Sequence, residues 1–173
     1  ASAAPNSDES LKRALRQLRQ RVMATLIVRD IGGVATLSEV VESMTQLADV
    51  TTNFALDFVH RQLCEQFGEP LDSRGQVQRL LIIGMGKLGG RELNVSSDVD
   101  YIFVYPEEGQ TAGGRRRIDN YDFFLRLGKR LIAALGVQLA LSGVLLGLAG
   151  PAINTDGGTI ALMVVWFALR ALL

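Results

Sequence analysis

The stretch "GMGKLGGRELNVSSDVDYIFVY", residues 84–105, holds most of what the chain reveals about its fold and its site. It follows an apolar run at residues 79–83, which is typical of a strand buried on both faces. After the glycines, residues 99–105 are rich in β-branched and aromatic side chains and predict a second strand. The segment between the strands is either a loop that cradles a dinucleotide or a scaffold that holds metal ions over a nucleoside phosphate.

The dinucleotide interpretation rests on Gly84, Gly86 and Gly89, which satisfy G-x-G-x-x-G directly after a predicted strand. A dinucleotide-binding fold also needs a full helix after the glycines and an acidic residue about twenty positions further on. Too few residues separate the glycines from the next strand for such a helix. A Walker phosphate loop fits no better, because Lys87 is followed by leucine and precedes the last glycines.

Two aspartates favour the metal interpretation. Residues i and i+2 of a strand share a face, so Asp98 and Asp100 project together, about 6 to 7 Å apart, while Val99 faces the core. Like charges repel unless a cation lies beside them. Mg²⁺ prefers oxygen ligands and commonly combines one or two carboxylates with substrate phosphates. The pattern predicts a magnesium site at Asp98 and Asp100, although a turn cap followed by a solvent-facing residue would also place two aspartates here.

The residues before the aspartates suit a phosphate. Gly89 and Gly90 have no side chain, so backbone N–H groups can approach a phosphate closely there. Lys87 can reach the same phosphate or remain an exposed loop residue. A glycine pair, a short spacer and an aspartate pair together predict a grip on a nucleoside triphosphate.

Helical patterns surround this motif. Apolar residues at spacings of three and four predict an amphipathic helix over residues 7–30. Thr36 and Glu39 match a capping box that begins a second helix, running to about Asp49, and a third helix follows until Gly68. Beyond a polar loop containing "GGRRR", Asp119 can cap a further helix. The residues expected on the buried face of that last helix are Phe123, Phe124, Leu127 and Leu131.

Composition excludes several classes of protein. The 173 residues are 48% hydrophobic, which suits one domain or a small domain with an attached piece. Eighteen basic and eighteen acidic residues leave no overall field to recruit nucleic acid. The single cysteine, Cys64, excludes an internal disulfide and a multi-cysteine zinc site and suits a core position; the single histidine, His60, has no predicted role. The N-terminus does not read as a secretory signal, so we expect a cytoplasmic protein.

The stretch "GMGKLGGRELNVSSDVDYIFVYPEEG", continued by "GGRRRIDNYDFFLRLGKRLI", resembles the bifunctional glutamine synthetase adenylyltransferase and adenylyl-removing enzymes of bacteria. "GKLGGRELNVSSDVD" and "IDNYDFF" are more similar to the N-terminal, adenylyl-removing copy. The resemblance is strong over residues 80–135 and looser before them. It implies an α+β chain with the nucleotidyltransferase fold of DNA polymerase β: a helical segment (1–68), a partial nucleotidyltransferase core (69–135) and a divergent tail (136–173).

The resemblance also implies a reaction. Inorganic phosphate attacks the adenylyl phosphorus on a tyrosine of glutamine synthetase and releases ADP, or AMP is added there from ATP. Asp98 and Asp100 are implied as Mg²⁺ ligands, and Gly89, Gly90 and Ser97 as the lining of the phosphate site. The implied partners are glutamine synthetase, ATP or ADP and phosphate, without nucleic acid or a membrane.

The tail departs from this family pattern. The resemblance implies a third metal-binding aspartate in a segment like "RVDMRLRP", but the expected position falls in an apolar stretch near Leu148, and Asp156 is the one carboxylate beyond Arg130. A shifted reading frame would explain the change. We expect a helical apolar tail; because residues 131–150 are long enough to span a bilayer, a membrane hairpin is an alternative. For the function of the whole chain, the alternative to an enzyme is a catalytically impaired fragment that only binds nucleotide or glutamine synthetase.

Overall fold

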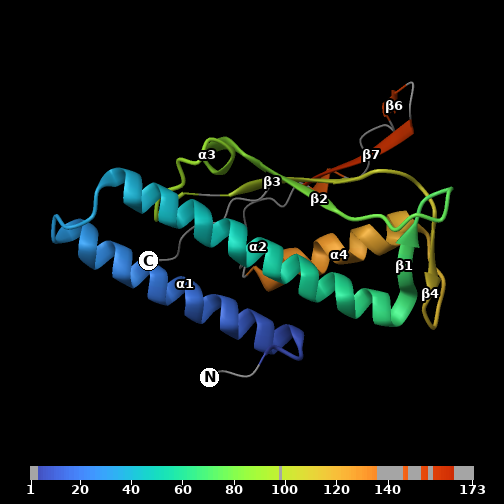
Figure 1. The fold of residues 1–173 in the computed structure, drawn as a ribbon, viewed down its shortest axis with the longest axis horizontal. Helices are drawn as coiled ribbons and strands as arrows, with labels where there is room; N and C mark the ends of the chain where they lie inside the picture. Colours follow the sequence, from blue (N-terminus) through green and yellow to red (C-terminus); the bar gives the residue numbers. More distant parts are fainter. Residues whose placement is uncertain (1–3, 98, 136–145, 148–152, 156–157, 166–173) are drawn as a thin grey trace.

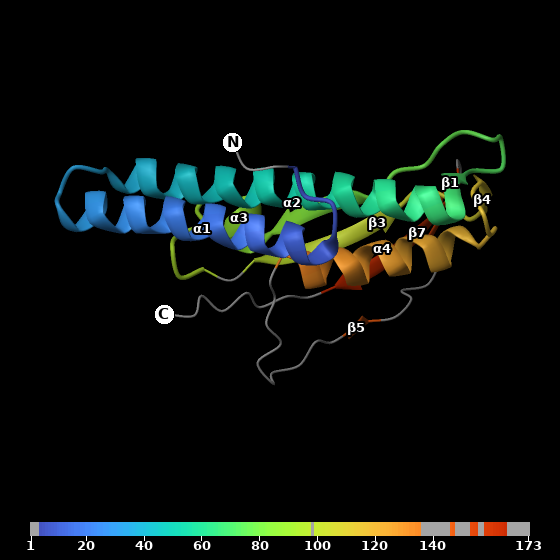
Figure 2. The same cartoon turned by 90° about the horizontal axis from the view of Figure 1, so that it is seen from below.

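The computed structural model describes residues 4–97, 99–135, 146–147, 153–155 and 158–165, the last three ranges by their backbone alone. Two long helices run antiparallel, a third lies beside them, and a small antiparallel sheet lies along these helices (Figure 1, Figure 2). The described part of the chain is therefore α+β, as expected.

The first helix, α1 (Asp8–Ile31), confirms the helix predicted over residues 7–30. Ser7 caps it by accepting a hydrogen bond from the Ser10 N–H, and the Ser10 hydroxyl in turn accepts from the Ser7 N–H. Leu11, Leu15 and Leu26 form its buried stripe. These buried residues therefore follow the helical spacing predicted from the sequence.

The second helix, α2 (Leu37–Phe67), is continuous, so the prediction of two separate helices with a break near Asp49 is wrong. No glycine or proline lies between the two predicted segments, and the threonines there do not interrupt the helix. The Thr51 hydroxyl donates to the Leu47 carbonyl at 2.7 Å, and the Thr52 hydroxyl bonds to the Tyr101 hydroxyl at 2.7 Å. Both hydroxyls find partners without breaking the helical backbone.

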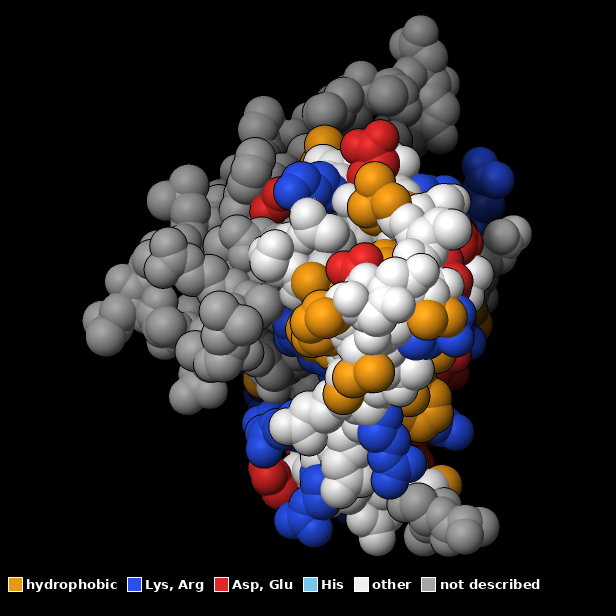
Figure 3. Space-filling view, turned by 90° about the vertical axis from the view of Figure 1, so that its left-hand side faces the viewer, with side chains coloured by type: hydrophobic (Ala, Val, Ile, Leu, Met, Phe, Trp, Pro, Cys, Tyr) orange, Lys and Arg blue, Asp and Glu red, His pale blue; other side chains and the backbone are white. Residues whose placement is uncertain are grey.

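The start of α2 confirms half of the predicted capping box. The Thr36 side chain accepts from the Glu39 N–H at 3.2 Å. The Glu39 carboxylate instead accepts from Nε and Nη2 of Arg29 at 3.1 and 2.7 Å. This ion pair joins the last turn of α1 to the first turn of α2. At this end of the molecule Ile31 and Leu37 are 83% and 76% exposed. Figure 3 faces this end and shows hydrophobic side chains among charged ones.

Helix α4 (Asn120–Ala134) begins after Asp119 as predicted, and Phe123, Phe124, Leu127 and Leu131 are fully buried. The Asp119 side chain makes no capping bond and accepts from Gln110 Nε2 at 3.0 Å. Phe124 stacks on Tyr105 with ring centroids 4.8 Å apart, and Phe123 meets His60 edge to face at 5.5 Å. Helix α4 is therefore fixed against both the sheet and α2.

The larger sheet has the strand order β2-β3-β7-β5, in which β5 is Leu146–Gly147 and β7 is Gly158–Val165; β6 (Ile153–Thr155) pairs with β7. Its first two strands, β2 (Leu81–Met85) and β3 (Asp100–Tyr105), are antiparallel. The prediction that β2 is buried on both faces is wrong: Leu81, Ile83 and Met85 are 56%, 48% and 43% exposed. Strand β2 lies at the edge of the sheet with one face toward the helices, and a short apolar run does not reveal that arrangement.

A second, two-stranded sheet pairs β1 (Gly68–Leu71) with β4 (Gln110–Gly113), where we expected only loops. Gly68 has φ +85°, and a Cβ on it would lie 2.0 Å from the Ala112 carbonyl oxygen. Only glycine allows this reversal directly after α2 and this close strand contact. The β1–β4 strand pair therefore holds the end of α2 close to the start of α4.

The expectation of a helical tail is wrong for the tail residues that are described. They form strands β5 (Leu146–Gly147), β6 (Ile153–Thr155) and β7 (Gly158–Val165), and β7 pairs with β3. Leu148, Asp156 and most of the candidate membrane span lie outside the described residues. Within the described part of the chain, no helix combines the length and the apolarity needed to cross a membrane.

Candidate active site

Asp100 is the first residue of β3 and pairs with Met85, the last residue of β2. The next residue, Tyr101, is buried toward α2, where it meets Thr52, so alternation directs Asp100 to the opposite face of the sheet. Val99 is 6% exposed, as predicted for a core-facing residue. Asp98 lies outside the described residues, so the predicted pairing of the two carboxylates stays a prediction.

Gly86 brings the glycine segment to Asp100. It follows β2 with φ +54°, and a Cβ on it would lie 3.6 Å from Asp100 Oδ2. The register of β2 and β3 creates this contact, since Met85 and Asp100 are direct partners. Gly86 was not among the predicted site residues, although the antiparallel pairing of two strands joined by a glycine segment could have indicated it.

The other glycines of the motif have packing roles. Helix α3 (Gly86–Gly89) folds back onto β2, and a Cβ on Gly89 would lie 2.6 Å from the Gly84 carbonyl oxygen. A Cβ on Gly84 would lie 2.9 Å from the Leu88 side chain. The absence of a side chain at Gly89 is thus required by the fold itself. Gly90 is exposed, with its nearest such contact at 3.6 Å, so it remains open to a ligand.

Arg91 anchors this segment to α2. Its Nη2 lies 2.5 Å from Glu42 Oε1, and its Nη1 lies 3.7 Å from Asp49 Oδ2. The hydrogen bond from Arg91 lowers the pKa of Glu42, and Glu42 raises the pKa of Arg91. Arg91 also adopts φ +57°. Sequence spacing gave no signal for this contact, because Arg91 and Glu42 are distant in the chain.

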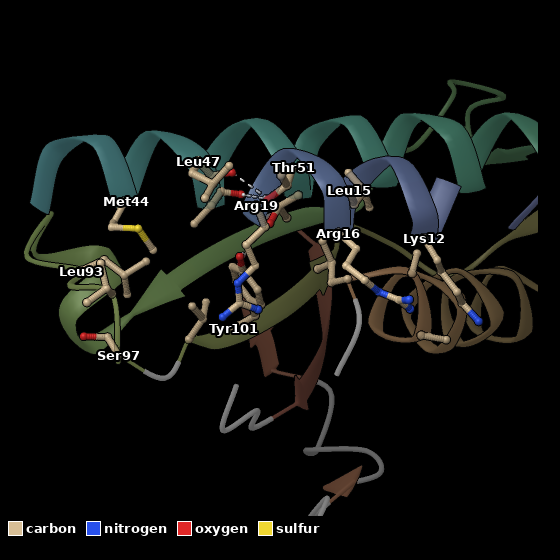
Figure 4. Close-up of a pocket in the computed structure, with 17 residues that line it drawn as sticks. Lys12, Leu15, Arg16, Arg19, Met44, Leu47, Thr51, Leu93, Ser97 and Tyr101 are labelled. Atoms are coloured by element: carbon tan, nitrogen blue, oxygen red, sulfur yellow. Dashed lines mark hydrogen bonds between the residues drawn. The ribbon is translucent and has the colours of Figure 1, made fainter. Parts of the chain in front are cut away.

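Ser97 closes a local turn. Its hydroxyl donates to Asn94 Oδ1 at 2.7 Å and accepts from the Asn94 N–H at 3.1 Å. The side chain lines a cavity of about 580 Å³ between α1, α2 and β3. Figure 4 shows Lys12, Arg16 and Arg19 reaching along this cavity from α1, with Ser97 at the end away from Lys12.

Two of the predicted phosphate-site residues, Gly89 and Ser97, line different cavities. Gly89 lines a smaller cavity of about 160 Å³ beside Asp49 and Asn53, whereas Ser97 lines the larger one. Asp100 lines neither, because it lies on the other face of β3. Lys87 is exposed on α3, beside the Gly86 that contacts Asp100. The structure therefore places Gly86 next to Asp100, whereas Gly89, at the other end of α3, lies on the α2 side beside Asp49.

Comparison with known proteins finds a family whose model matches this chain. The family model described as "Glutamate-ammonia ligase adenylyltransferase" matches residues 2–146, which is most of the chain. The chain belongs to the glutamate-ammonia ligase adenylyltransferase family. This membership confirms the resemblance inferred from the glycine and aspartate motif.

Relatives of the adenylyltransferase family carry a more specific description. The chain is similar to proteins named bifunctional glutamine synthetase adenylyltransferase/adenylyl-removing enzyme. It is 54% identical over 131 residues to that of Nitrosomonas europaea, covering 74% of this chain and 14% of the relative. The identity to the protein of Ralstonia nicotianae is 50% over 135 residues, which are 78% of this chain and 14% of that relative. The identity to the protein of Pseudomonas aeruginosa is 47% over 129 residues, which are 74% of this chain and 13% of that relative. The chain thus spans about a seventh of these relatives' length.

A nucleotidyltransferase family implies a divalent metal ion. Asp100 fits such an ion in its chemistry: it offers carboxylate oxygens on an accessible face, against a glycine that leaves the neighbouring space open. The adenylyltransferase family match ends at residue 146, so the tail strands β6 and β7 lie beyond it.

Proposed function

We propose that this chain supplies the metal and phosphate site of a nucleotidyltransferase that acts on the adenylylated tyrosine of glutamine synthetase. The observation that carries the proposal is the position of Asp100 Oδ2, 3.6 Å from where a Cβ on Gly86 would lie, which places a carboxylate beside a glycine segment in a chain of this family. The names of the relatives, which combine adenylyltransferase and adenylyl-removing activities, support the substrate.

The proposed reaction is phosphorolysis. An oxygen of inorganic phosphate attacks the adenylyl phosphorus, the bond from that phosphorus to the tyrosine oxygen breaks, and the tyrosine oxygen takes up a proton. ADP and unmodified tyrosine are the products. A divalent ion, which we propose to be Mg²⁺, would neutralise charge on the transferred group. Addition of AMP from ATP at the same tyrosine is the alternative reaction, and the similarity of the motifs to the adenylyl-removing copy favours removal.

The residues of the chain have distinct proposed roles. Asp98 and Asp100 bind the metal. The ammonium group of Lys87 holds phosphate oxygens, because this side chain is exposed next to Gly86. Gly90 lines the site by its lack of a side chain, while its own N–H donates to the Gly86 carbonyl at 3.0 Å. Gly89 and Ser97 act indirectly: Gly89 seats α3 on β2, and Ser97 holds the turn that leads into β3. Arg91 positions the whole segment on α2.

The test is to incubate the chain with adenylylated glutamine synthetase, phosphate and Mg²⁺ and to measure ADP. ADP formation that is lost in Asp100→Asn supports the proposed activity. The absence of a third carboxylate segment favours a second candidate, a module that binds nucleotide without chemistry. That candidate is supported by Mg²⁺-dependent nucleotide binding without ADP formation. Absence of both ADP formation and nucleotide binding would overturn both proposals.

A further inference from the structure

A second group of metal-ligating side chains lies at the far end of α2, away from Asp100. His60 and Cys64 are one turn apart on α2, and Glu69 follows on β1. One ligand atom from each of the three lies within 4.8 Å of the others. Among the described residues, this is the group of three or more such side chains that could surround one ion.

Local structure explains why these three side chains meet. Positions i and i+4 lie on the same face of a helix, so the His60 ring and the Cys64 sulfur are neighbours. Gly68 then ends α2 in the left-handed region, and its N–H donates to the Cys64 carbonyl. This reversal brings Glu69 back over the last turn of the helix.

The distances suit a tetrahedral zinc-class ion. His60 Nδ1 and Cys64 Sγ are 3.3 Å apart. In a tetrahedral site with a metal–nitrogen bond near 2.0 Å and a metal–sulfur bond near 2.3 Å, these two ligand atoms lie roughly 3.5 Å apart. The pair therefore already has the spacing of two ligands, and a carboxylate oxygen of Glu69 lies within 4.8 Å of both.

Glu69 carries the second observation. Its Oε2 atom is buried and has no hydrogen-bond partner among the described residues. A buried carboxylate oxygen without a partner is costly unless a cation or donor occupies the space beside it. Three protein ligands of the N, S and O types, with a fourth position open, are typical of zinc.

A cationic side chain now occupies part of this space. Arg79 Nη1 lies 3.0 Å from His60 Nδ1. A guanidinium can only donate, so Nδ1 accepts in the tautomer that carries its proton on Nε2. Arg79 Nη1 is also 3.5 Å from Nε2, so the ring must turn to aim its Nδ1 lone pair at an ion between these groups. Burial, followed by the charge of Arg79, lowers the pKa of His60, which keeps the ring neutral. Arg79 itself is exposed and can swing into solvent, which gives an ion a path inward.

We propose that His60, Cys64 and Glu69 form a binding site for a zinc-class divalent cation, which competes with Arg79 for the His60 lone pair. Binding would release the Cys64 proton to solvent, since a coordinating thiol is deprotonated. Burial and then the negative charge of Glu69 raise the pKa of this thiol to about 12 without the metal. The site would tie the end of α2 to β1, and this role is independent of the proposed phosphate chemistry at Asp100.

Cobalt titration of the untagged chain tests the proposal without an activity assay. Co²⁺ bound to a thiolate produces a near-ultraviolet charge-transfer band, and Cys64 is the single cysteine in the sequence. We expect that band at one Co²⁺ per chain, independent of chain concentration, and its loss when Zn²⁺ is added. A band that requires two chains per ion, or no band at all, would overturn the proposal.

Variants separate a built site from loose binding to a thiol. Cys64→Ser should abolish the band, and His60→Gln or Glu69→Gln should weaken Co²⁺ affinity roughly tenfold or more. Arg79→Gln should do the opposite and tighten binding, because the competing cation is gone; this exposed variant stays informative even if His60→Gln unfolds. Unchanged affinity in Glu69→Gln together with unchanged affinity in Arg79→Gln would identify adventitious binding to Cys64 and overturn the proposal.

Discussion

Asp100 Oδ2 lies next to Gly86, at 3.6 Å from the position that a Cβ on this glycine would take. The contact joins the end of β2 to the start of β3 across the Met85–Asp100 pair. Any group held by Asp100 therefore has the glycine segment, with its exposed backbone, as its immediate neighbour.

Gly86→Ala should reduce both stability and nucleotide binding. A residue other than glycine at φ +54° costs about 1–2 kcal/mol, and the added methyl group reaches Asp100. Gly33→Ala is a matched control, because Gly33 has φ +66° and a Cβ there would meet nothing within 4 Å. Urea unfolding should show similar losses for both variants, whereas calorimetry should show weakened nucleotide binding for Gly86→Ala alone. Equal binding in the two variants would mean that the Gly86 contact has no role in the site.

Gly89→Ala and Gly90→Ala should differ in stability, because only residue 89 packs tightly against the strand before it. A Cβ at residue 89 would lie 2.6 Å from the Gly84 carbonyl, so we expect a loss of about 1–3 kcal/mol in the free energy of unfolding. At residue 90 the nearest atom is 3.6 Å away, and the change should stay within about 0.5 kcal/mol. Equal destabilisation of the two variants, measured by urea unfolding, would contradict the packing of α3 on β2.

The fold was predictable where one segment alone determines its structure. The periodic stripe of α1 and the four buried residues of α4 follow from spacing, because an amphipathic helix buries its apolar face against the rest of the fold. The break predicted near Asp49 was wrong, because the tertiary bond between Thr52 and Tyr101 is not visible in local sequence. The β1–β4 pair was missed for a similar reason: its partners are far apart in the chain, and Gly68 reads equally as a helix end.

The candidate site was predictable in its residue types and less so in its geometry. Spacing predicted Val99 inward and Asp100 outward, and Val99 is buried as expected. The division of the glycines, with Gly86 toward Asp100 and Gly89 toward β2, depends on strand register and on the turn into α3. The sequence pattern alone does not predict that turn.

The buried bond between Thr52 and Tyr101 should show the cost of an unpaired hydroxyl. Thr52→Val leaves the Tyr101 hydroxyl without its partner, so we expect a loss of about 1–3 kcal/mol in the free energy of unfolding. Adding Tyr101→Phe to that variant removes the orphaned group and should restore part of the loss. A double variant less stable than the sum of the two single changes predicts would argue against this bond as the link between α2 and β3.

The pairing of Arg91 with Glu42 should be visible in a titration. The hydrogen bond from Arg91 lowers the pKa of Glu42, so the pair's contribution to stability is present above the ordinary glutamate pKa and is lost as pH falls through the lowered value. Carbon-detected NMR should find the Glu42 pKa below 4.5 and should find it raised in Arg91→Gln. An unchanged Glu42 pKa in that variant would show that Arg91 does not hold the glycine segment on α2.

The most direct test of the central claim is calorimetric binding of ADP with and without Mg²⁺. The wild-type chain should bind ADP more tightly when Mg²⁺ is present, and this gain should disappear in Asp98→Asn and in Asp100→Asn. Asp122→Asn, which changes an exposed carboxylate on the first turn of α4 by the same charge, should keep the gain. If Asp98→Asn and Asp100→Asn retain the Mg²⁺-dependent gain of the wild type, these aspartates do not hold the metal and the proposed site is contradicted.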